Sequence, residues 1–165
     1  MARKTNSGNS RPSRRRQCGN AMVETALVLV PFFALVMGII DFGRAFYART
    51  AIQYGVQAGT RYAVTFQTLN GMCQDASIKE IVRRNSIGFL TATDLANKVF
   101  VRYYLPDTLA ATGSNLPGNI VEVSVEGYQF KWIAPLWRSI APMTIVARSS
   151  DRMEGLPGGT SPPCR

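Results

Sequence analysis

The sequence predicts an α+β protein in which one long N-terminal helix spans a membrane and continues into a small external head. Three observations predict this class: a basic N-terminal segment, a long apolar run behind it, and a C-terminal half in which a helical pattern is followed by alternating, β-branched segments. The head should hold a second helix and a short antiparallel sheet of about three strands. We divide the chain into a basic leader (1–19), a transmembrane helix (20–41), its extramembrane continuation (42–66), the α+β head (67–150) and a flexible Gly/Pro-rich tail (151–165).

The first 19 residues contain six cations and no anion, and residues 20–40 contain one charged side chain, Glu24. A helix over these 21 residues would be about 32 Å long, which matches the hydrocarbon thickness of a bilayer. Cations beside the first apolar segment stay in the cytoplasm. We therefore predict a single-pass protein of a bacterial inner membrane, in contact with its lipid, with a cytoplasmic N-terminus and a periplasmic or extracellular head.

Glu24 lies about one turn inside the predicted cytoplasmic boundary, where a carboxylate is costly unless a cation neutralises it. It is the fifth residue after Gly19, the glycine that ends the basic leader. A glycine, a glutamate at this spacing and an apolar helix resemble the processing site of type IV prepilins. The resemblance implies that a prepilin peptidase cuts between Gly19 and Asn20. It also implies that the freed amino group of Asn20 pairs with Glu24 of a neighbouring subunit.

Two other interpretations of this N-terminus stay open. A secretory signal peptide has the same order of charged and apolar regions, and Gly43, Arg44 and Ala45 form a weak small-x-small cleavage site. The apolar block is long for a signal peptide, however, and Asp41 precedes that cut. If the Gly19 site is accidental, the chain is instead a signal-anchored periplasmic binding or sensor module that keeps its leader.

Residues 41–66 contain no proline, and their apolar residues recur every three or four positions. This period predicts that the transmembrane helix continues outward as one helix of about 40 residues or more, kinked at Pro31. One face of the continuation carries small residues and would allow another helix to approach closely. It could pack against neighbouring subunits or against the head of the same chain, and it consists of Ala48, Ala51, Gly55, Gly59 and Ala63.

Residues 19–66 are similar to the TadE-like family, the minor pilins or pseudopilins of the tight-adherence (Flp) pilus system. The positions that carry this resemblance are Gly19, Glu24, Pro31, Asp41, Gly43, Arg44, Gly59, Arg61 and Ala63. Thr25 departs from the pattern of Flp-type pilins, which usually have tyrosine after the glutamate. The resemblance implies a structural or assembly component of a tight-adherence pilus, with a prepilin peptidase and other pilin or pilus-assembly subunits as partners.

Asn70 and Gly71 should break the long helix, and a capping box from Ser77 to Glu80 predicts the start of the next one. The expected buried side of this second helix is Ile78, Ile81, Val82 and Leu90. Strands are predicted at residues 99–105, at 121–126 with an extension to 132, and at 143–149, with a loop at 106–119. The proline-flanked connection at 134–142 could pack on the end of the sheet or touch the membrane.

Cys18 leaves with the leader in this scheme, so Cys73 and Cys164 remain in a compartment that is predicted to be oxidising. We expect them to form a disulfide. The bond would close a loop of about 90 residues and hold the C-terminal tail.

The sequence contains no histidine, no zinc-binding cysteine spacing and no phosphate-binding glycine loop. We therefore predict no enzymatic activity, no catalytic residue, no metal and no cofactor. The net charge of +9 comes largely from the leader, because the rest of the chain has 13 cations and 10 anions. No nucleic-acid partner is expected. The remaining rival function is an adhesive tip pilin that binds DNA or a surface ligand.

Overall fold

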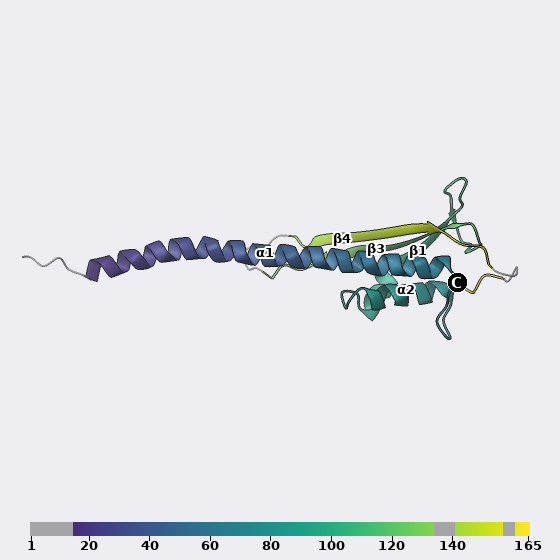
Figure 1. Cartoon of the computed structure of the whole chain (residues 1–165), viewed down its shortest axis with the longest axis horizontal. Coiled ribbons are helices and arrows are strands. Elements are labelled where there is room, and N and C mark those ends of the chain that lie inside the picture. Colours follow the sequence, from purple (N-terminus) through teal and green to yellow (C-terminus); the bar gives the residue numbers. More distant parts are fainter. Residues whose placement is uncertain (1–14, 134–140, 157–160) are drawn as a thin grey trace, which may run out of the picture. The chain divides into compact units, whose positions relative to one another are not determined.

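The computed structural model describes residues 15–133, 141–156 and 161–165, with side chains from residue 21 onward. The elements are α1 (Arg15–Val64), α2 (Gln74–Asn85), α3 (Ala92–Asn97), β1 (Val99–Tyr104), β2 (Ala111–Thr112), β3 (Ile120–Phe130) and β4 (Met143–Arg152) (Figure 1). They confirm an α+β fold with a long N-terminal helix. The chain forms two compact units, Met1–Ile40 and Asp41–Arg165. Most of the connection predicted at 134–142 lies outside the described residues.

Helix α1 is 50 residues long and passes through Pro31 without interruption. The predicted kink at that proline stays a prediction. The helix ends at Val64, two residues before the predicted end, and Phe66 then adopts a left-handed backbone conformation with φ of 54°. The turn that follows contains Gly71 at φ 77°, a conformation that glycine adopts without steric cost. Asn70 and Gly71 lie in the non-helical connection between α1 and α2, but they do not break α1, which ends six residues before Asn70.

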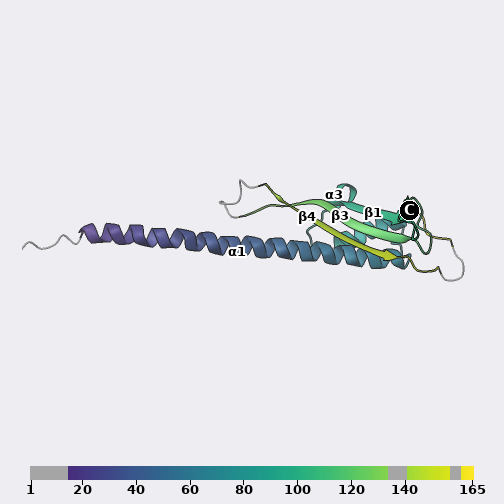
Figure 2. The same ribbon diagram turned by 90° about the horizontal axis from the view of Figure 1, so that it is seen from above.

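The sheet has four strands in the order β2-β1-β3-β4, and all neighbouring strands are antiparallel. The additional strand, β2, has only two residues and lies in the segment that we predicted as a loop. It pairs Thr112 with Tyr103 and Ala111 with Tyr104. A strand this short has no periodicity to detect, and it exists because the chain folds back onto the end of β1. The long strands β3 and β4 run side by side in Figure 2.

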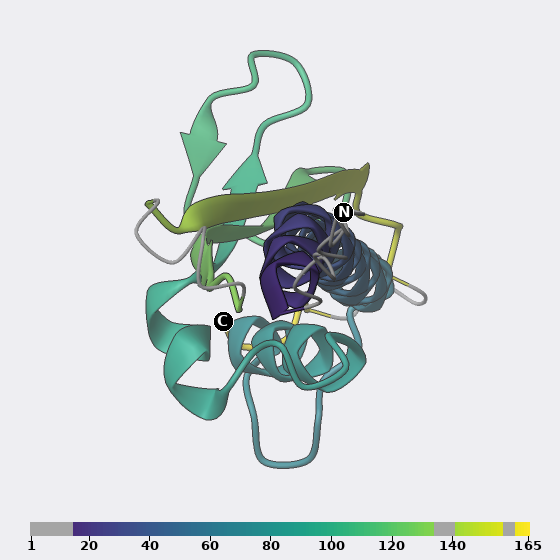
Figure 3. The same ribbon diagram turned by 90° about the vertical axis from the view of Figure 1, so that its left-hand side faces the viewer.

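The core of the second unit lies between one face of the sheet and the helices, with α1 and α2 on the same side of the sheet (Figure 3). The apolar face predicted for β3 is confirmed, because Val121, Val123 and Val125 are completely buried. Ser124 on the opposite face is also completely buried, so that face is not solvated throughout as predicted. Other buried members of this core include Ile52 and Val56 of α1, Ile78 and Val82 of α2, Leu90, Val99 and Ile145. Ile81, which we expected on the buried side of α2, is only partly buried.

The capping box predicted from Ser77 to Glu80 is wrong. Helix α2 begins one turn earlier, with Cys73 as its N-cap residue, and the Ser77 hydroxyl donates a hydrogen bond to the Cys73 carbonyl at 2.9 Å. Glu80 does not reach back toward the helix start, because its carboxylate pairs forward with Arg83 at 2.6 Å and Arg84 at 2.8 Å. Two nearby cations on the same helix face compete successfully for this acid.

A capping box does occur at the start of α3. The Thr91 backbone N–H donates to Asp94 Oδ2 at 2.9 Å, and the Thr91 hydroxyl donates to the same oxygen at 2.6 Å. Asp94 also forms an ion pair with Lys98 at 2.7 Å. The Lys98 pair and the two Thr91 hydrogen bonds lower the pKa of Asp94 to about 2. This acid therefore holds the beginning and the end of the short helix together.

Candidate functional site: the anchor helix and the surfaces of the head

The apolar segment of α1 exposes nearly all of its large side chains. Leu27, Phe32 and Ile39 are each more than half exposed, and the helix is long and apolar enough to cross a bilayer. A continuous apolar surface of this kind is unfavourable in water and marks a contact with lipid or protein. The helix thus indicates a membrane anchor. Gly19 and Asn20, the predicted cleavage site, are both helical.

Glu24 is exposed on this helix. Its neighbour Thr25 satisfies its hydroxyl within the helix, by donating to the Ala21 carbonyl at 2.8 Å. Within residues 21–133, 141–156 and 161–165, no hydrogen bond or ion pair involves the Glu24 carboxylate. A cation that neutralises this carboxylate in a membrane would therefore have to come from outside the described part of the chain.

The small-residue face of α1 packs against the head of the same chain. Ala48 and Ala63 are completely buried, Ala51 is nearly so, and Gly55 and Gly59 are also buried. A Cβ built on Gly59 would lie 2.5 Å from Cγ2 of Val82 on α2. Of the two alternatives that the sequence left open, the structure shows packing within one chain. These five residues are not accessible to a neighbouring subunit while the head is folded.

A different face of α1 is exposed along the second unit. It carries Phe42 (70% exposed), Phe46 and Tyr54, together with the polar side chains of Arg49 and Gln57. Tyr54 and Gln57 line two adjoining shallow grooves on this face. We name Phe42, Phe46, Arg49, Tyr54 and Gln57 the outer face of α1.

Asp41, the first residue of the second unit, is a buried carboxylate that sequence analysis did not single out as a site. It is only 2% exposed, and both of its oxygens accept the backbone N–H of Ile133 at 3.1 Å. Arg44 also donates to it at 3.3 Å. In the sequence, only the i,i+3 spacing of Asp41 and Arg44 could have indicated this ion pair. The Asp41 carboxylate fixes the segment that follows β3 to helix α1.

Aromatic side chains extend this cluster. The Arg44 guanidinium lies 5.3 Å from the centre of the Phe130 ring, and Phe130 and Trp132 meet edge to face at 5.4 Å. Trp132 Nε1 is buried and has no hydrogen-bond partner in the part of the chain that the structure describes. Asp41, Arg44, Phe130, Trp132 and Ile133 together form what we call the Asp41 cluster.

The structure joins Cys73 to Cys164 through a disulfide, with the two Cα atoms 4.9 Å apart. The Gln74 backbone N–H donates to the Cys164 carbonyl at 2.7 Å, and Arg165 pairs with Asp75 at 3.1 Å. The last residues of the chain are therefore held at the start of α2. The beginning of the predicted tail also belongs to the sheet, because β4 continues to Arg152.

A buried pair of amides supports this attachment. The Asn115 side chain donates to the Gln74 side-chain oxygen at 2.6 Å and to the Pro163 carbonyl at 2.9 Å, and Gln74 donates to the Ala63 carbonyl at 3.1 Å. Gln74 is completely buried. Single polar residues in a loop and at a helix start have no sequence pattern that predicts such a contact. The amides connect α1, α2, the β2–β3 loop and the C-terminus.

Tyr103 lies beside this attachment. Its hydroxyl donates to Asp75 at 2.8 Å, and the Arg165 guanidinium lies 4.6 Å from the centre of its ring. Burial, together with the hydrogen bond to Asp75, raises the pKa of the Tyr103 hydroxyl. The phenol therefore stays neutral and remains a hydrogen-bond donor.

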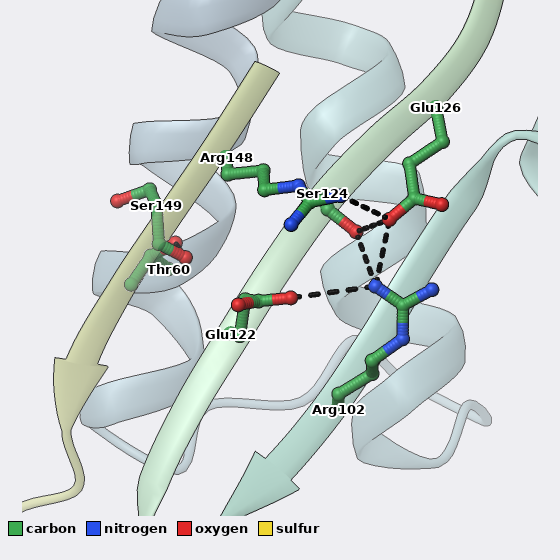
Figure 4. A network of polar contacts seen from close by, with 7 residues as sticks. All are labelled: Thr60, Arg102, Glu122, Ser124, Glu126, Arg148 and Ser149. Carbon is green, nitrogen blue, oxygen red and sulfur yellow. Dashed lines mark hydrogen bonds and ion pairs between the residues drawn. The ribbon is translucent and has the colours of Figure 1, made fainter. Parts of the chain in front are cut away.

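The outer face of the sheet carries a network of ion pairs (Figure 4). Arg102 on β1 pairs with Glu126 at 2.7 Å and Glu122 at 3.3 Å, and it donates to Ser124 at 3.1 Å. The hydrogen bond from Arg102 lowers the pKa of Glu126, and the same pair raises the pKa of Arg102. Arg148 on β4 also pairs with Glu126, at 3.4 Å. These charges hold neighbouring strands together, and we assign them no chemistry.

Within the described residues, no three side chains of histidine, cysteine, aspartate or glutamate gather into a candidate metal site.

Comparison with known proteins gives further evidence about the class of this protein. The chain combines one long apolar helix with a small α+β head. The model of the family described as TadE-like protein matches residues 19–61, which confirms the resemblance to that family. This is a structural family, and it points to the tight-adherence pilus system. No curated protein and no solved structure matches the chain.

Proposed function

We propose that this protein is a minor pilin or pseudopilin that acts as a structural or assembly component of a tight-adherence pilus, and that a prepilin peptidase matures it by cleavage after Gly19. The observation that carries the proposal is the position of Glu24. The family match begins at Gly19 and includes Glu24 five residues later, on an exposed apolar helix. Cleavage removes the leader 1–19 and leaves residues 20–41 as the membrane span. The basic leader keeps the N-terminus cytoplasmic, so the head is periplasmic or extracellular.

The chemistry of cleavage explains why an acid is tolerated at this depth. Cutting the peptide bond after Gly19 creates a new cation, the α-amino group of Asn20. Opposite charges about 4 Å apart attract by about 4 kcal/mol at an intermediate dielectric, and desolvation removes much of this gain. The pair between Asn20 of one subunit and Glu24 of the next therefore sets the register of packed helices more than their affinity.

The outer face of α1 from Phe46 onward is the surface that we assign to neighbouring subunits. The small-residue face is already occupied by α2, since a Cβ on Gly55 or Gly59 would overlap atoms of that helix. Phe46 and Tyr54 are more than half exposed and can pack against another helix without unfolding the head. This assignment replaces the small-residue face as the proposed intersubunit surface.

The test is the replacement of Glu24 in cells that assemble the pilus. Glu24→Ala and the isosteric Glu24→Gln should both insert into the membrane and fail to support normal pili, because neither can neutralise the Asn20 amino group. Thr25→Ala is the matched control. Its hydroxyl bonds only within its own helix among the described residues, so assembly should be unaffected. Normal pili in both Glu24 variants would contradict the proposed role of the carboxylate.

The rival function, binding of DNA or a surface ligand by the head, has a distinct readout. Arg102 and Arg148 of the outer sheet face are paired with Glu126. Because this carboxylate partly neutralises both arginines, we expect the head to bind DNA weakly if at all. Tight binding by the full-length protein in detergent, with a steep dependence on salt, would favour the adhesive tip pilin instead.

A further inference from the structure

We propose that the end of the head that carries Asp41 is seated on the membrane surface and contacts anionic lipid headgroups. This inference rests on the proposed function only in that the helix over residues 20–41 spans the bilayer, with Asp41 at its outer end. It concerns an additional contact, made by two side chains that follow the anchor directly, Phe42 and Arg44, and by three that lie much further along the chain, Lys131, Ile133 and Met143. The contact surface consists of Phe42, Arg44, Lys131, Ile133 and Met143, which we call the lipid-facing end.

The Asp41 cluster places these residues together. Ile133 is 92 positions away from Asp41 in the chain, yet its backbone N–H donates to both carboxylate oxygens of Asp41 at 3.1 Å. Met143 lies at the same end, because it pairs with Phe130 across β3 and β4. Phe42 follows Asp41 directly. The last residues of β3 and the first residues of β4 are thus held at the first turn of helix in the second unit.

Chain continuity places this end at the bilayer. Asp41 is the residue after Ile40, where the charge-free apolar run ends. A span of about 20 residues fills the hydrocarbon layer, so the Asp41 turn falls at the level of the headgroups. Residues tied to Asp41 by direct hydrogen bonds are held near the same level.

The exposed groups suit that environment. Phe42 is 70% and Ile133 59% exposed, although both are large and apolar, and Met143 is also exposed. Apolar side chains bordered by cations are typical of segments that lie in the interface of a membrane. Lys131 and Arg44 are both exposed, whereas the one acid of the Asp41 cluster is buried and paired with Arg44. The surface therefore presents positive charge to anionic lipid.

Depth measurements on nitroxide-labelled protein would test the contact. The full chain carries Cys18→Ser, so that with the Cys73–Cys164 disulfide intact the label attaches only to one introduced cysteine. The labelled variants are Ile133→Cys at the lipid-facing end, Leu116→Cys at an exposed position of the β2–β3 loop, and Leu29→Cys in the anchor. Each is reconstituted as one copy per nanodisc, in phosphatidylglycerol or in phosphatidylcholine. The readout is the ratio of collision rates with oxygen, which enters lipid, to those with a water-soluble nickel chelate.

We expect the ratio at position 133 to be several-fold higher than at position 116 in phosphatidylglycerol. It should fall in phosphatidylcholine and with the added substitution Lys131→Glu. Equal ratios at 133 and 116, with position 29 deep in lipid, would overturn this inference and leave the anchor intact. A water-exposed label at position 29 would overturn the anchor itself. Protection at 133 that appears only with two copies in a disc would assign the surface to a second copy and overturn the lipid contact.

Discussion

Gly55 of α1 lies so close to α2 that a Cβ built on it would be 2.7 Å from the carbonyl oxygen of Val82 and 2.6 Å from the Ser86 hydroxyl. Backbone atoms cannot move aside as a flexible side chain can. The close approach of α1 and α2 therefore depends on glycine at this position. This close contact is the reason why the small-residue face of α1 belongs to the core of the head.

The first prediction is that Gly55→Ala destabilises the head. Overpacking at a rigid contact costs about 1–3 kcal/mol, which exceeds the gain of about 0.5–1 kcal/mol that alanine gives in a helix. Gly43→Ala is the matched control, because a Cβ there meets nothing within 4 Å. Chemical unfolding in detergent, followed by near-UV circular dichroism, should show a loss for Gly55→Ala and none for Gly43→Ala. Equal stabilities of the two variants would refute the packing argument.

The second prediction concerns Asp41. Asp41→Ala removes both acceptors of the part-buried Ile133 N–H and should cost about 1.5–3 kcal/mol, the usual contribution of a hydrogen bond to a charged group. Hydrogen exchange in detergent micelles should show faster exchange of the Ile133 amide. Asp107→Ala, at an exposed acid in the loop after β1, is the control and should leave this amide unchanged. Unchanged protection of Ile133 in Asp41→Ala would contradict the assigned hydrogen bonds.

The third prediction concerns the disulfide. Replacing Cys73 and Cys164 by serine opens a loop with a sequence separation of 91 residues. The chain-entropy treatment gives about 4–5 kcal/mol for a loop of this size. We expect a large fall in the unfolding midpoint and faster exchange of the Gln74 amide, which donates to the Cys164 carbonyl. Cys18→Ser should change neither quantity. Modification of Cys73 or Cys164 by a thiol reagent without reductant would show that the bond is absent.

The fourth prediction is a loss of stability in acid. Pairing with Lys98 and hydrogen bonds from Thr91 lower the pKa of Asp94 to about 2, and pairing with Arg83 and Arg84 lowers the pKa of Glu80 to about 2. Both values lie below those of the unfolded chain, so the folded state binds fewer protons. The stabilisation is complete above about pH 5 and is lost as the pH falls toward 2.

The ion pairs of Asp94 and of Glu80 are partly exposed, so each acid should contribute no more than about 1 kcal/mol to the free energy of unfolding. The combined variant Glu80→Gln, Asp94→Asn should flatten the acid limb of a plot of unfolding free energy against pH. Lys98→Met should remove only that part of the Asp94 contribution that comes from the Lys98 ion pair, because the Thr91 hydrogen bonds remain. A variant curve parallel to that of the native protein between pH 5 and 2 would exclude these acids as the cause.

The sequence predicted those parts of the fold that depend on periodicity. The helix pattern of residues 41–66 and the alternation in β3 are long repeats, and hydrophobic burial enforces both. Ser77 shows the opposite case, because a local capping pattern lost to a start fixed by Cys73 and to the pairing of Glu80 with two arginines. The two-residue strand β2 has no pattern of its own and arises from pairing with the end of β1.

The site was predictable to a similar extent. Gly19 and Glu24 are adjacent to clear compositional boundaries, so sequence alone could single them out. The small-residue face was visible, but the sequence could not choose between a neighbouring subunit and α2, since both would bury the same residues. The contact between Asp41 and Ile133 joins positions far apart in the chain, and nothing local in either segment indicates it.

Maturation after Gly19 is tested most directly by the N-terminal sequence of the protein extracted from native membranes. We expect Asn20 as the first residue, a corresponding intact mass, and loss of this species in Gly19→Ala, with Gly8→Ala as the control that is still cut. Protein that begins at Met1 or Ala2, with the leader attached, would exclude this maturation and leave an ordinary tethered head. A first residue of Phe46 would instead identify a secreted domain.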